Sequence, residues 1–359
     1  MLTSAKVGRS RVAKRFPLSS PGAGGAAPRS LRKRCAARWA LAGFVGLGLP
    51  CGAEARNTGY VFVGHERMNA IAVIDPRRED ETLKWVSTCH GPHEMKFRND
   101  RTQVLVACRD DDAIDVVDVA TLRVVDHIPT GPRPVTFELG RDENWLFVPD
   151  PETSTVAEIS LGDKLIERAI PVGADPEAIL ASADGKTLFV ASEASDLVHV
   201  IDLAAGAVTD NVQVGTRPRC FLLLPNSREL WVSNGRSAEV LIVDRATKRV
   251  SASVGLRPPG VPPDSVTPVG MAATKDGATV VVALGLANAL AFVDAGTRTV
   301  RDYVPVGSNP WAVALSPDEQ TVYVANAQSD DVSVVDMASH KATRAVPVGR
   351  LPHSVLVDN

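Results

Sequence analysis

Apolar and polar residues alternate along most of this chain, in short runs separated by turn-forming residues. One stretch near the C-terminus contains four such runs in succession: WAVALS (311–316), TVYVAN (321–326), VSVVD (332–336) and ATRAVPV (342–348). Period-two alternation of β-branched residues between polar turns is typical of β-strands. The 3.6-residue periodicity that marks helical repeats is not visible. The pattern predicts an all-β protein.

The four-strand unit is repeated along the chain. A Val-Gly-x-x-Pro phrase, in more or less degraded form, marks each unit, and its proline recurs at Pro92, Pro134, Pro176, Pro218, Pro268, Pro310 and Pro352. The steps between these prolines are 42 residues, except for one step of 50 between Pro218 and Pro268. A 42-residue period with four strands per unit is typical of the blades of a β-propeller.

Polar residues recur at two further positions of the unit. An Asp stands 26 residues after the proline in five units, and we expect it to accept hydrogen bonds from turn amides: Asp118, Asp202, Asp244, Asp294 and Asp336. An Asp or Asn stands eight residues after the proline, where we expect a tight turn with left-handed backbone: Asp100, Asp142, Asp184, Asn226, Asp276 and Asp318.

The two ends of the repeat region are each incomplete. YVFVGH (60–65) matches the second strand of a unit, with no first strand before it, and HSVLVDN (353–359) matches a first strand with no unit after it. Pairing the last strand with residues 60–65 would remove two open sheet edges. The sequence therefore predicts a seven-bladed propeller of four-stranded blades over residues 56–359, closed by its C-terminal strand.

Residues 1–55 have the character of an export signal. The ten Lys and Arg residues between Lys6 and Arg38 are followed by an apolar run at 38–50 and by Ala-Glu-Ala at 53–55. This order is typical of a secretory signal peptide, and the apolar run is short for a membrane span. We expect cleavage near Ala55 and a periplasmic mature chain.

Charge and cysteine content narrow the class of partner. The mature chain keeps 29 of the 39 basic and 41 of the 42 acidic residues, so its net charge is about −12. Nucleic acid is not expected as a partner, because phosphate binding needs a basic surface. No later stretch is long and apolar enough for a membrane span. Three cysteines remain, which suffice for one disulfide in an oxidising compartment.

Several phrases resemble known propellers. YVAN (323–326) and VSVVD (332–336) resemble the YVTN family of seven-bladed propellers, and the resemblance covers residues 58–359. Residues 210–234, 258–271, 282–295 and 348–355 are similar to propellers associated with PQQ-dependent catabolism. That resemblance implies an exported protein encoded near quinoprotein alcohol dehydrogenases, without a firmly assigned activity. Related propellers are subunits of periplasmic quinohaemoprotein amine dehydrogenases, which makes a structural subunit role an analogy.

The units differ most at one face of the predicted ring. The residue after the proline is His93, Val135, Glu177, Arg219, Val269, Trp311 or His353, and the residue ten before the Asp position is His65 or Cys108 in the first two units. Cys89 replaces a recurrent glycine, and His90 follows it. Two adjoining blades thus carry four histidines and two cysteines on one rim.

These residues admit three interpretations. Neutral imidazole and thiolate are ligands for copper, zinc or iron, so His65, His93 and His353 could hold copper or haem iron. Alternatively, Cys89 and Cys108 form a disulfide that staples one blade. In the third interpretation the residues are unpaired and have no role in function, and His65 hydrogen-bonds to backbone as the Asn in other units would.

Other rim residues also allow a structural and a functional interpretation. Glu177 and Arg219 occupy equivalent positions on consecutive blades, which favours an ion pair over a ligand carboxylate at Arg219. Trp311 either packs between blades or stacks on a ring-shaped ligand such as a sugar or quinone. The eight extra residues around 258–265 are rich in Pro and form either a plain surface loop or a docking element.

Three functions are compatible with these features. The first is a non-enzymatic binding or scaffold protein that works beside PQQ-dependent alcohol oxidation, with a periplasmic quinoprotein dehydrogenase or cytochrome as partner. The second is a metal-binding or haem-binding redox subunit of such a system. The third is a propeller lactonase or other hydrolase, although no G-x-S-x-G, H-E-x-x-H or P-loop motif occurs.

Overall fold

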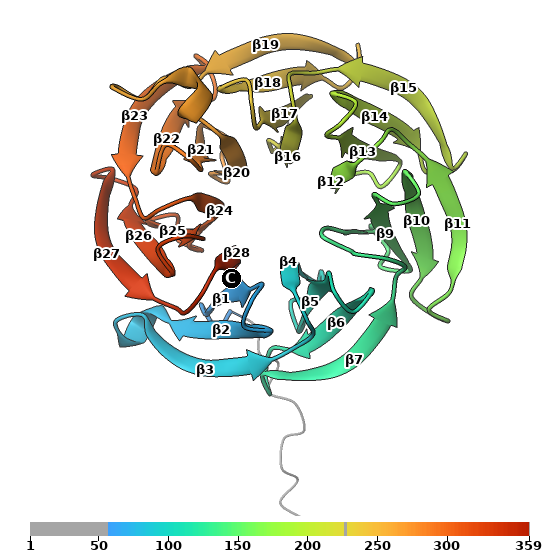
Figure 1. Cartoon of the computed structure of the whole chain (residues 1–359), viewed down its shortest axis with the longest axis horizontal. Helices are drawn as coiled ribbons and strands as arrows, with labels where there is room; N and C mark the ends of the chain where they lie inside the picture. Colours follow the sequence, from blue (N-terminus) through green and yellow to red (C-terminus); the bar gives the residue numbers. More distant parts are fainter. Residues whose placement is uncertain (1–56, 226–227, 359) are drawn as a thin grey trace, which may run out of the picture. The chain divides into compact units, whose positions relative to one another are not determined.

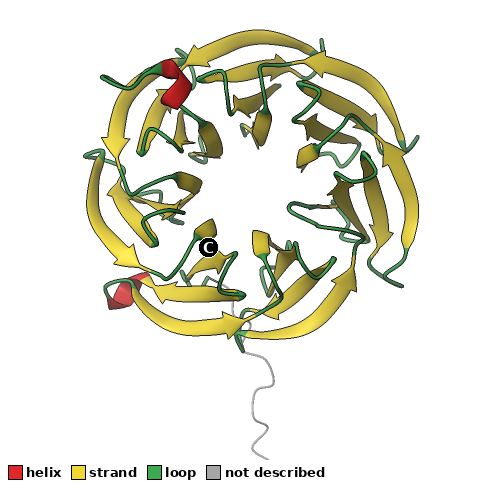
Figure 2. Cartoon of the chain, viewed as in Figure 1, coloured by secondary structure: helices red, strands yellow, loops and turns green. Residues whose placement is uncertain are grey.

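Seven four-stranded antiparallel sheets stand around a central channel in the computed structural model, which describes residues 57–225 and 228–358 (Figure 1). The predicted fold class, an all-β seven-bladed propeller, is confirmed. Two short 3₁₀ helices, η1 (Pro76–Arg78) and η2 (Pro263–Ser265), are the helical segments of the described residues (Figure 2). The signal peptide predicted over residues 1–55 lies outside the described residues.

The strands of each blade follow one another in sequence, except in the first blade. From the channel outwards, blade 1 contains β28 (Pro352–Val357), β1 (Val61–His65), β2 (Ala70–Asp75) and β3 (Glu81–Ser87); blade 2 contains β4 (Pro92–Phe97), β5 (Gln103–Cys108), β6 (Ala113–Asp118) and β7 (Arg123–Pro129); blade 3 contains β8 (Glu138–Leu139), β9 (Trp145–Asp150), β10 (Thr155–Ser160) and β11 (Ile166–Pro171). Blade 4 contains β12 (Pro176–Ala181), β13 (Thr187–Ser192), β14 (Leu197–Asp202) and β15 (Ala207–Gln213); blade 5 contains β16 (Pro218–Leu223), β17 (Glu229–Asn234), β18 (Glu239–Asp244) and β19 (Arg249–Gly255). Blade 6 contains β20 (Pro268–Ala273), β21 (Thr279–Leu284), β22 (Ala289–Asp294) and β23 (Thr299–Pro305); blade 7 contains β24 (Pro310–Leu315), β25 (Thr321–Asn326), β26 (Asp331–Asp336) and β27 (Lys341–Pro347).

The hydrophobic core lies between neighbouring blades. Strand β1 shows the arrangement, because Val61 and Val63 pack against blade 7 while Phe62 packs against blade 2. Successive side chains of a strand point to opposite faces of its sheet, so one strand contributes to two interblade cores. The second and third strands of each blade are accordingly buried on both faces, whereas the outermost strands are largely exposed.

The C-terminal strand closes the ring. Strand β28 pairs antiparallel with β1, with Val355 opposite Val63 and Leu356 opposite Phe62. Asp358, which is fully buried, accepts hydrogen bonds from the Thr58 amide at 2.8 Å and from the Thr58 hydroxyl at 2.6 Å. The predicted closure is therefore present, and a carboxylate fastens the first described residues to the last.

The turn between the first and second strands corrects one prediction. The predicted left-handed position is wrong by one residue, since the positive φ falls on the residue that follows, as at Arg101 (58°) and Gly277 (70°). Asp100 instead accepts the Thr102 amide at 3.0 Å, and Asp276 accepts the Ala278 amide at 2.9 Å. An Asp side chain gains more as an acceptor at the start of a turn than by adopting left-handed backbone.

The other recurrent Asp behaves as expected. At the end of the third strand, Asp118 accepts the Thr121 amide, Asp244 the Thr247 amide and Asp294 the Thr297 amide, each at 2.7 Å. A residue with the same turn contact in several blades has a structural role, as predicted for these carboxylates.

Deleting residues 349–359 should destabilise the whole ring. The deletion exposes the inner edge of β1 and removes one wall of the blade 1 core, so we expect the unfolding midpoint to fall by about 10 °C or more. Thermal unfolding and size-exclusion chromatography measure this effect. A synthetic peptide of residues 349–359 should restore the midpoint when added to the truncated chain, and an unchanged midpoint after truncation would contradict closure by β28.

Candidate functional site

A β-bulge near the start of each regular innermost strand points one side chain into the channel. The pairing register shifts across Glu177 in β12, across Arg219 in β16 and across Trp311 in β24. Shifts at the corresponding places free His93 in β4, Val269 in β20 and His353 in β28 from direct pairing. Because a bulge leaves a residue unpaired and turns its side chain, the variable position after each proline faces the channel.

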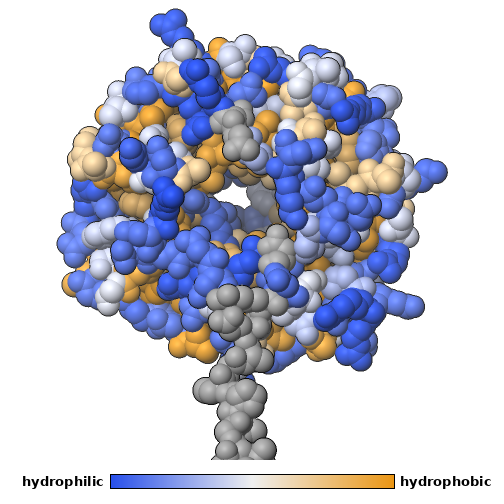
Figure 3. Space-filling view, turned by 180° about the vertical axis from the view of Figure 1, so that it is seen from behind, coloured by the Kyte–Doolittle hydropathy of each residue, from blue (hydrophilic) through white to orange (hydrophobic). Residues whose placement is uncertain are grey.

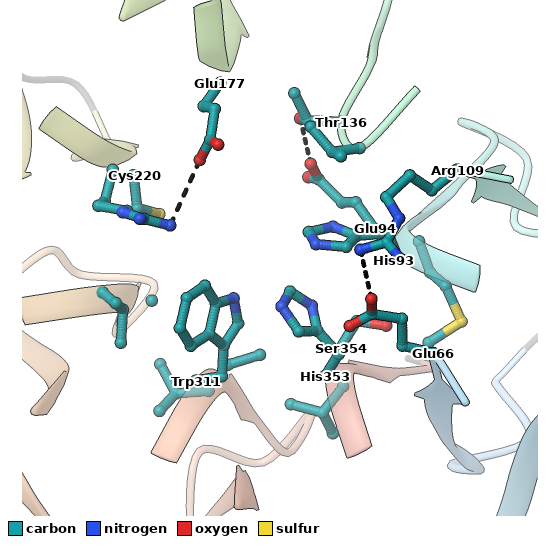
Figure 4. A pocket seen from close by; sticks show the side chains of 18 of the residues that line it. Glu66, His93, Glu94, Arg109, Thr136, Glu177, Cys220, Trp311, His353 and Ser354 are labelled. Atoms are coloured by element: carbon teal, nitrogen blue, oxygen red, sulfur yellow. Dashed lines mark hydrogen bonds and ion pairs between the residues drawn. The ribbon is translucent and has the colours of Figure 1, made fainter. Parts of the chain in front are cut away.

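These side chains line a cavity of about 470 Å³ at the channel (Figure 4). Its lining includes all seven variable residues, His93, Val135, Glu177, Arg219, Val269, Trp311 and His353. Figure 4 shows Glu177, Trp311 and His353 pointing into one space from three different innermost strands. The channel is also open at the opposite face of the ring (Figure 3).

Arg219 contacts lining residues on both of its sides, Glu177 and Trp311. Its Nη1 lies 3.3 Å from Glu177 Oε2, and its Nε lies 2.5 Å from an oxygen of the buried Glu193. Its guanidinium carbon also lies 5.4 Å from the centre of the Trp311 ring, within the range of a cation–π contact. The small side chain of Val269 stands between them in the ring order, which leaves room for Arg219 to reach Trp311.

Burial and a second carboxylate change the acidity of Glu177. Burial raises the pKa of Glu177 to about 7, with a further contribution from Glu193, while Arg219 acts in the opposite direction. A carboxyl group that is partly protonated near neutral pH can either donate or accept a hydrogen bond.

His93 and His353 form a neutral pair on the opposite wall. Their ring centroids are 3.8 Å apart, and His353 lies 4.8 Å from the Trp311 ring. Burial lowers the pKa of His93 to about 4, and burial together with His93 and the nearby arginines lowers the pKa of His353 well below its usual value. Both imidazoles are therefore uncharged at neutral pH.

His65 does not join this pair. It is fully buried inside blade 1, where its ring lies 5.2 Å from the Trp85 ring and its Nδ1 lies 3.3 Å from the Arg350 carbonyl oxygen. Burial lowers the pKa of His65 to about 4. The structure thus brings together His93 and His353 but not His65, so the three histidines suggested as metal ligands do not converge.

His90 also lies apart from the cavity. It is exposed, its backbone amide donates to Asp111 at 2.7 Å, and its Nδ1 lies 2.9 Å from an oxygen of the same carboxylate. These contacts hold the loop that precedes β4, and they leave His90 outside the cavity lining.

Cys89 and Cys108 form a disulfide, with 2.06 Å between the two sulfur atoms. The two residues are 19 positions apart. In blade 7 the equivalent residues are Gly307 and Asn326, and a Cβ added to Gly307 would lie 2.6 Å from the Asn326 amide nitrogen. The disulfide therefore occupies a contact that other blades make with a glycine against a polar side chain.

A second set of charged residues near the cavity was not predicted from the sequence. Arg109 pairs with Glu66 and with Asp110, and Arg217 pairs with Glu193 at 2.6 Å. Glu66, Arg109 and Glu193 each follow the last residue of a second strand, one position beyond the one at which His65 and Cys108 stand. A comparison between units of the residue that follows the second strand would have identified Glu66, Arg109 and Glu193 as candidates.

Comparison with known protein families identifies the family of this chain. The model of the YNCE-like β-propeller family matches residues 51–184 and 265–359. The chain belongs to the YNCE-like β-propeller family. No curated protein matches its sequence significantly. The resemblance to YVTN propellers is thus confirmed at the level of a propeller family, whereas the association with PQQ-dependent catabolism remains a prediction.

Solved structures of other proteins share the fold. The Kuenenia stuttgartiensis hydrazine synthase is 19% identical with a TM-score of 0.70, over 83% of this chain and 99% of that chain. The Pseudomonas aeruginosa periplasmic gluconolactonase PpgL is 20% identical with a TM-score of 0.71, over 84% and 99%. Dihydro-heme d1 dehydrogenase NirN is 13% identical with a TM-score of 0.65, over 84% and 76%. At these identities the likeness concerns the fold alone.

The insert of this family member is anchored at both ends. Leu256 and Val266 are buried in the core between blades 5 and 6, and the Arg257 amide donates to the Tyr303 hydroxyl at 2.5 Å. Between them, residues 259–264 are mostly exposed and end in η2. The insert is therefore a fixed surface projection, and it does not line the cavity. Among the described residues, no helix is long and apolar enough to cross a membrane.

Replacing the disulfide with the residues of blade 7 should preserve the fold at lower stability. In the double variant Cys89→Gly with Cys108→Asn, we expect the free energy of unfolding to fall by about 3 kcal/mol, the entropic value of closing a loop of this length. Chemical denaturation of the oxidised and reduced proteins measures the difference. Reduction should destabilise the wild type and leave the variant unchanged. Equal stability of the oxidised wild type and the variant would show that the disulfide contributes nothing.

Proposed function

We propose that this chain is a non-enzymatic, exported binding propeller that works as an accessory protein beside PQQ-dependent alcohol oxidation. Its partner in this proposal is a periplasmic quinoprotein dehydrogenase or its cytochrome. The observation that carries the binding function is the ring of residues that follow the seven prolines, where the backbone position recurs while most of the side chains differ. Residues that only stabilise a blade recur from unit to unit, whereas His93, Glu177, Arg219, Trp311 and His353 each occur at that position with different neighbours.

The arrangement of polar groups favours binding over catalysis. A Ser–His–Asn arrangement does occur, since Ser192 Oγ lies 2.9 Å from His199 Nε2 and Asn211 Oδ1 lies 2.5 Å from His199 Nδ1. However, Ser192 is fully buried, and His199 Nε2 also accepts the Gly173 amide at 2.9 Å. A base whose lone pair is held by a backbone amide cannot activate a nucleophile, so this arrangement stabilises blade 4.

The same contact recurs with other residues elsewhere in the ring. The Cys89 amide donates to Asp115 at 2.9 Å in blade 2, and the Gly307 amide donates to Ser333 at 3.2 Å in blade 7. A polar residue of the third strand thus accepts the amide that precedes the innermost strand. The recurrence supports a structural role for His199.

The environment of the cavity histidines opposes a metal or haem site. His93 and His353 lie beside each other, but Arg109 and Arg219 are close enough to lower the pKa of His353 further. The positive charges that disfavour an imidazolium also disfavour a bound cation. Because His65 is not within reach, the three histidines do not form one ligand set, and a copper site made of all three does not fit this arrangement.

The link to a quinoprotein system rests on sequence resemblance and on the insert. Residues 258–271 are part of the resemblance to propellers associated with PQQ-dependent catabolism, and the exposed residues 259–264 project from the ring on a fixed base. A rigid, proline-rich projection loses little conformational entropy on binding, which suits a docking element.

The partner can be identified by affinity capture from periplasmic extract of alcohol-grown cells. We expect the tagged wild type to retain a quinoprotein dehydrogenase or its cytochrome, and a variant without residues 258–265 to retain at least about tenfold less, the loss of roughly 1.4 kcal/mol of binding free energy. Val125→Ser, an exposed change on β7, serves as the matched control and should behave as the wild type. Recovery of neither redox protein by the wild type would contradict the accessory role.

A hydrolase is the second candidate, because Glu177 has a pKa of about 7, which is suitable for a general acid or base near neutral pH. A lactonase would hydrolyse a sugar lactone, and Glu177→Gln would slow the reaction by about 100-fold or more, while Glu167→Gln on the exposed strand β11 would not. Under the binding proposal we expect no turnover from any of the three proteins in a lactone hydrolysis assay. Turnover by the wild type that Glu177→Gln abolishes would overturn the non-enzymatic assignment.

A further inference from the structure

We propose that the channel cavity binds a neutral, hydroxyl-rich ring of monosaccharide size. This inference names the ligand class of the cavity and rests on the binding function proposed above. Three observations support it: the charged residues of the cavity lining are mostly paired with one another, the ring nitrogens of His353 make no hydrogen bond to the described residues, and Trp311 provides an aromatic wall. Each observation restricts the chemistry of the ligand.

Arginines and glutamates line the cavity in equal numbers. Three arginines and three glutamates contribute to the lining: Arg109, Arg133, Arg219, Glu66, Glu94 and Glu177. Most of them are already paired, Arg109 with Glu66 and Arg219 with Glu177, while Glu94 accepts the Thr136 hydroxyl and lies 3.4 Å from Lys96 Nζ. Because most of these charged groups are already paired within the protein, they favour a neutral ligand over an ion that would need a counter-charge of its own.

The lining offers hydrogen-bond donors and acceptors in alternation. Glu177 and Arg219 present both kinds of group to the same space, and the Glu177 carboxyl is itself shared between protonated and ionised forms near neutral pH. A hydroxyl group donates one hydrogen bond and accepts others, so a ligand with several hydroxyl groups satisfies such a mixed lining. A quinone offers carbonyl acceptors alone and could bind only to the donors of this lining.

His353 is a buried polar group that lacks a protein partner. The residue is 8% exposed, it lines the cavity, and among the described residues its ring nitrogens make no hydrogen bond. A neutral imidazole offers one donor and one acceptor. The ring nitrogens are not enclosed by protein, so they are open to the cavity, and a ligand hydroxyl group can hydrogen-bond to them.

Trp311 supplies an apolar surface beside these polar groups. Its ring lies next to His353 (Figure 4). The Arg219 guanidinium lies over the same ring, 5.4 Å from its centre. The ring C–H groups of a cyclic polyol form an apolar face that packs on an aromatic ring while its hydroxyl groups reach outwards. The cavity of about 470 Å³ is large enough for such a ring, since small-molecule sites begin at roughly 300 Å³.

Isothermal titration calorimetry of the mature wild type tests the ligand class. The probes are D-glucose and myo-inositol as neutral rings, D-gluconate as a charged, open-chain relative of glucose, and benzoate as a planar aromatic anion. We expect at least one neutral ring to bind about tenfold or more tightly than gluconate and benzoate, because Arg109 and Arg219 are already paired with carboxylates.

Two variants locate the binding site. Trp311→Leu and His353→Leu should each weaken binding of the preferred neutral probe by about tenfold, the loss of one stacking or hydrogen-bonding contact. Trp85→Leu, on the outer strand β3, is the matched control and should bind as the wild type. Circular dichroism checks that each variant is folded, and His353→Asn should retain more affinity than His353→Leu because the amide still donates and accepts.

The results of these binding experiments can contradict the ligand class without contradicting the accessory role. Tighter binding of gluconate or benzoate, or no binding of any neutral probe at about 10 mM, a concentration far above a useful affinity, overturns the ligand class. Capture of the quinoprotein partner can still succeed in that case, so the accessory role would stand. Binding of a neutral ring that is unaffected by both cavity substitutions would also overturn the inference.

Discussion

The pairing of β28 with β1 is the constraint on which the cavity depends. It brings residues nearly 300 positions apart in sequence into one sheet, and it places His353 between Trp311 of blade 7 and His93 of blade 2. Without this strand the wall of the channel would lack one of its seven members and β1 would keep an open edge. The buried carboxylate of Asp358 secures this pairing by binding Thr58. The strand that closes the ring therefore also completes the cavity wall.

The bulge near the start of the innermost strand explains how a repetitive chain makes an irregular site. Each unit repeats the proline, the turns and the two buried central strands, because these features are needed to pack one blade on the next. The residue that the bulge releases from pairing is under no such requirement, so it can differ in every blade. The ring of residues that follow the prolines, six of them at bulges, is therefore the place where seven similar units combine into a surface that none of them has alone.

Strand order could be predicted from the sequence, whereas the direction of individual rim side chains could not. The four runs found between 311 and 348 match β24 to β27 to within one residue, and the incomplete first and last units predicted the closure. The Glu177–Arg219 ion pair also followed from equivalent positions on consecutive blades. His65 and His353 come from paired strands, yet His353 faces the channel while His65 is enclosed inside blade 1. The bulge decides this direction, and it adds one unpaired residue that strict period-two reasoning does not include.

The two pairs of charged residues at the cavity determine what the histidines can do. Arg109 and Arg219 are fixed by Glu66 and by Glu177, so their positive charge stays close to His353 whether or not a ligand is bound. An imidazole in that position stays neutral, and a neutral imidazole that cannot attract a cation is useful mainly as a hydrogen-bonding group. Burial first, and then the charges of these arginines, thus make two histidines, which in the sequence suggested a metal site, into neutral hydrogen-bonding groups of the wall that we propose binds polar, uncharged molecules.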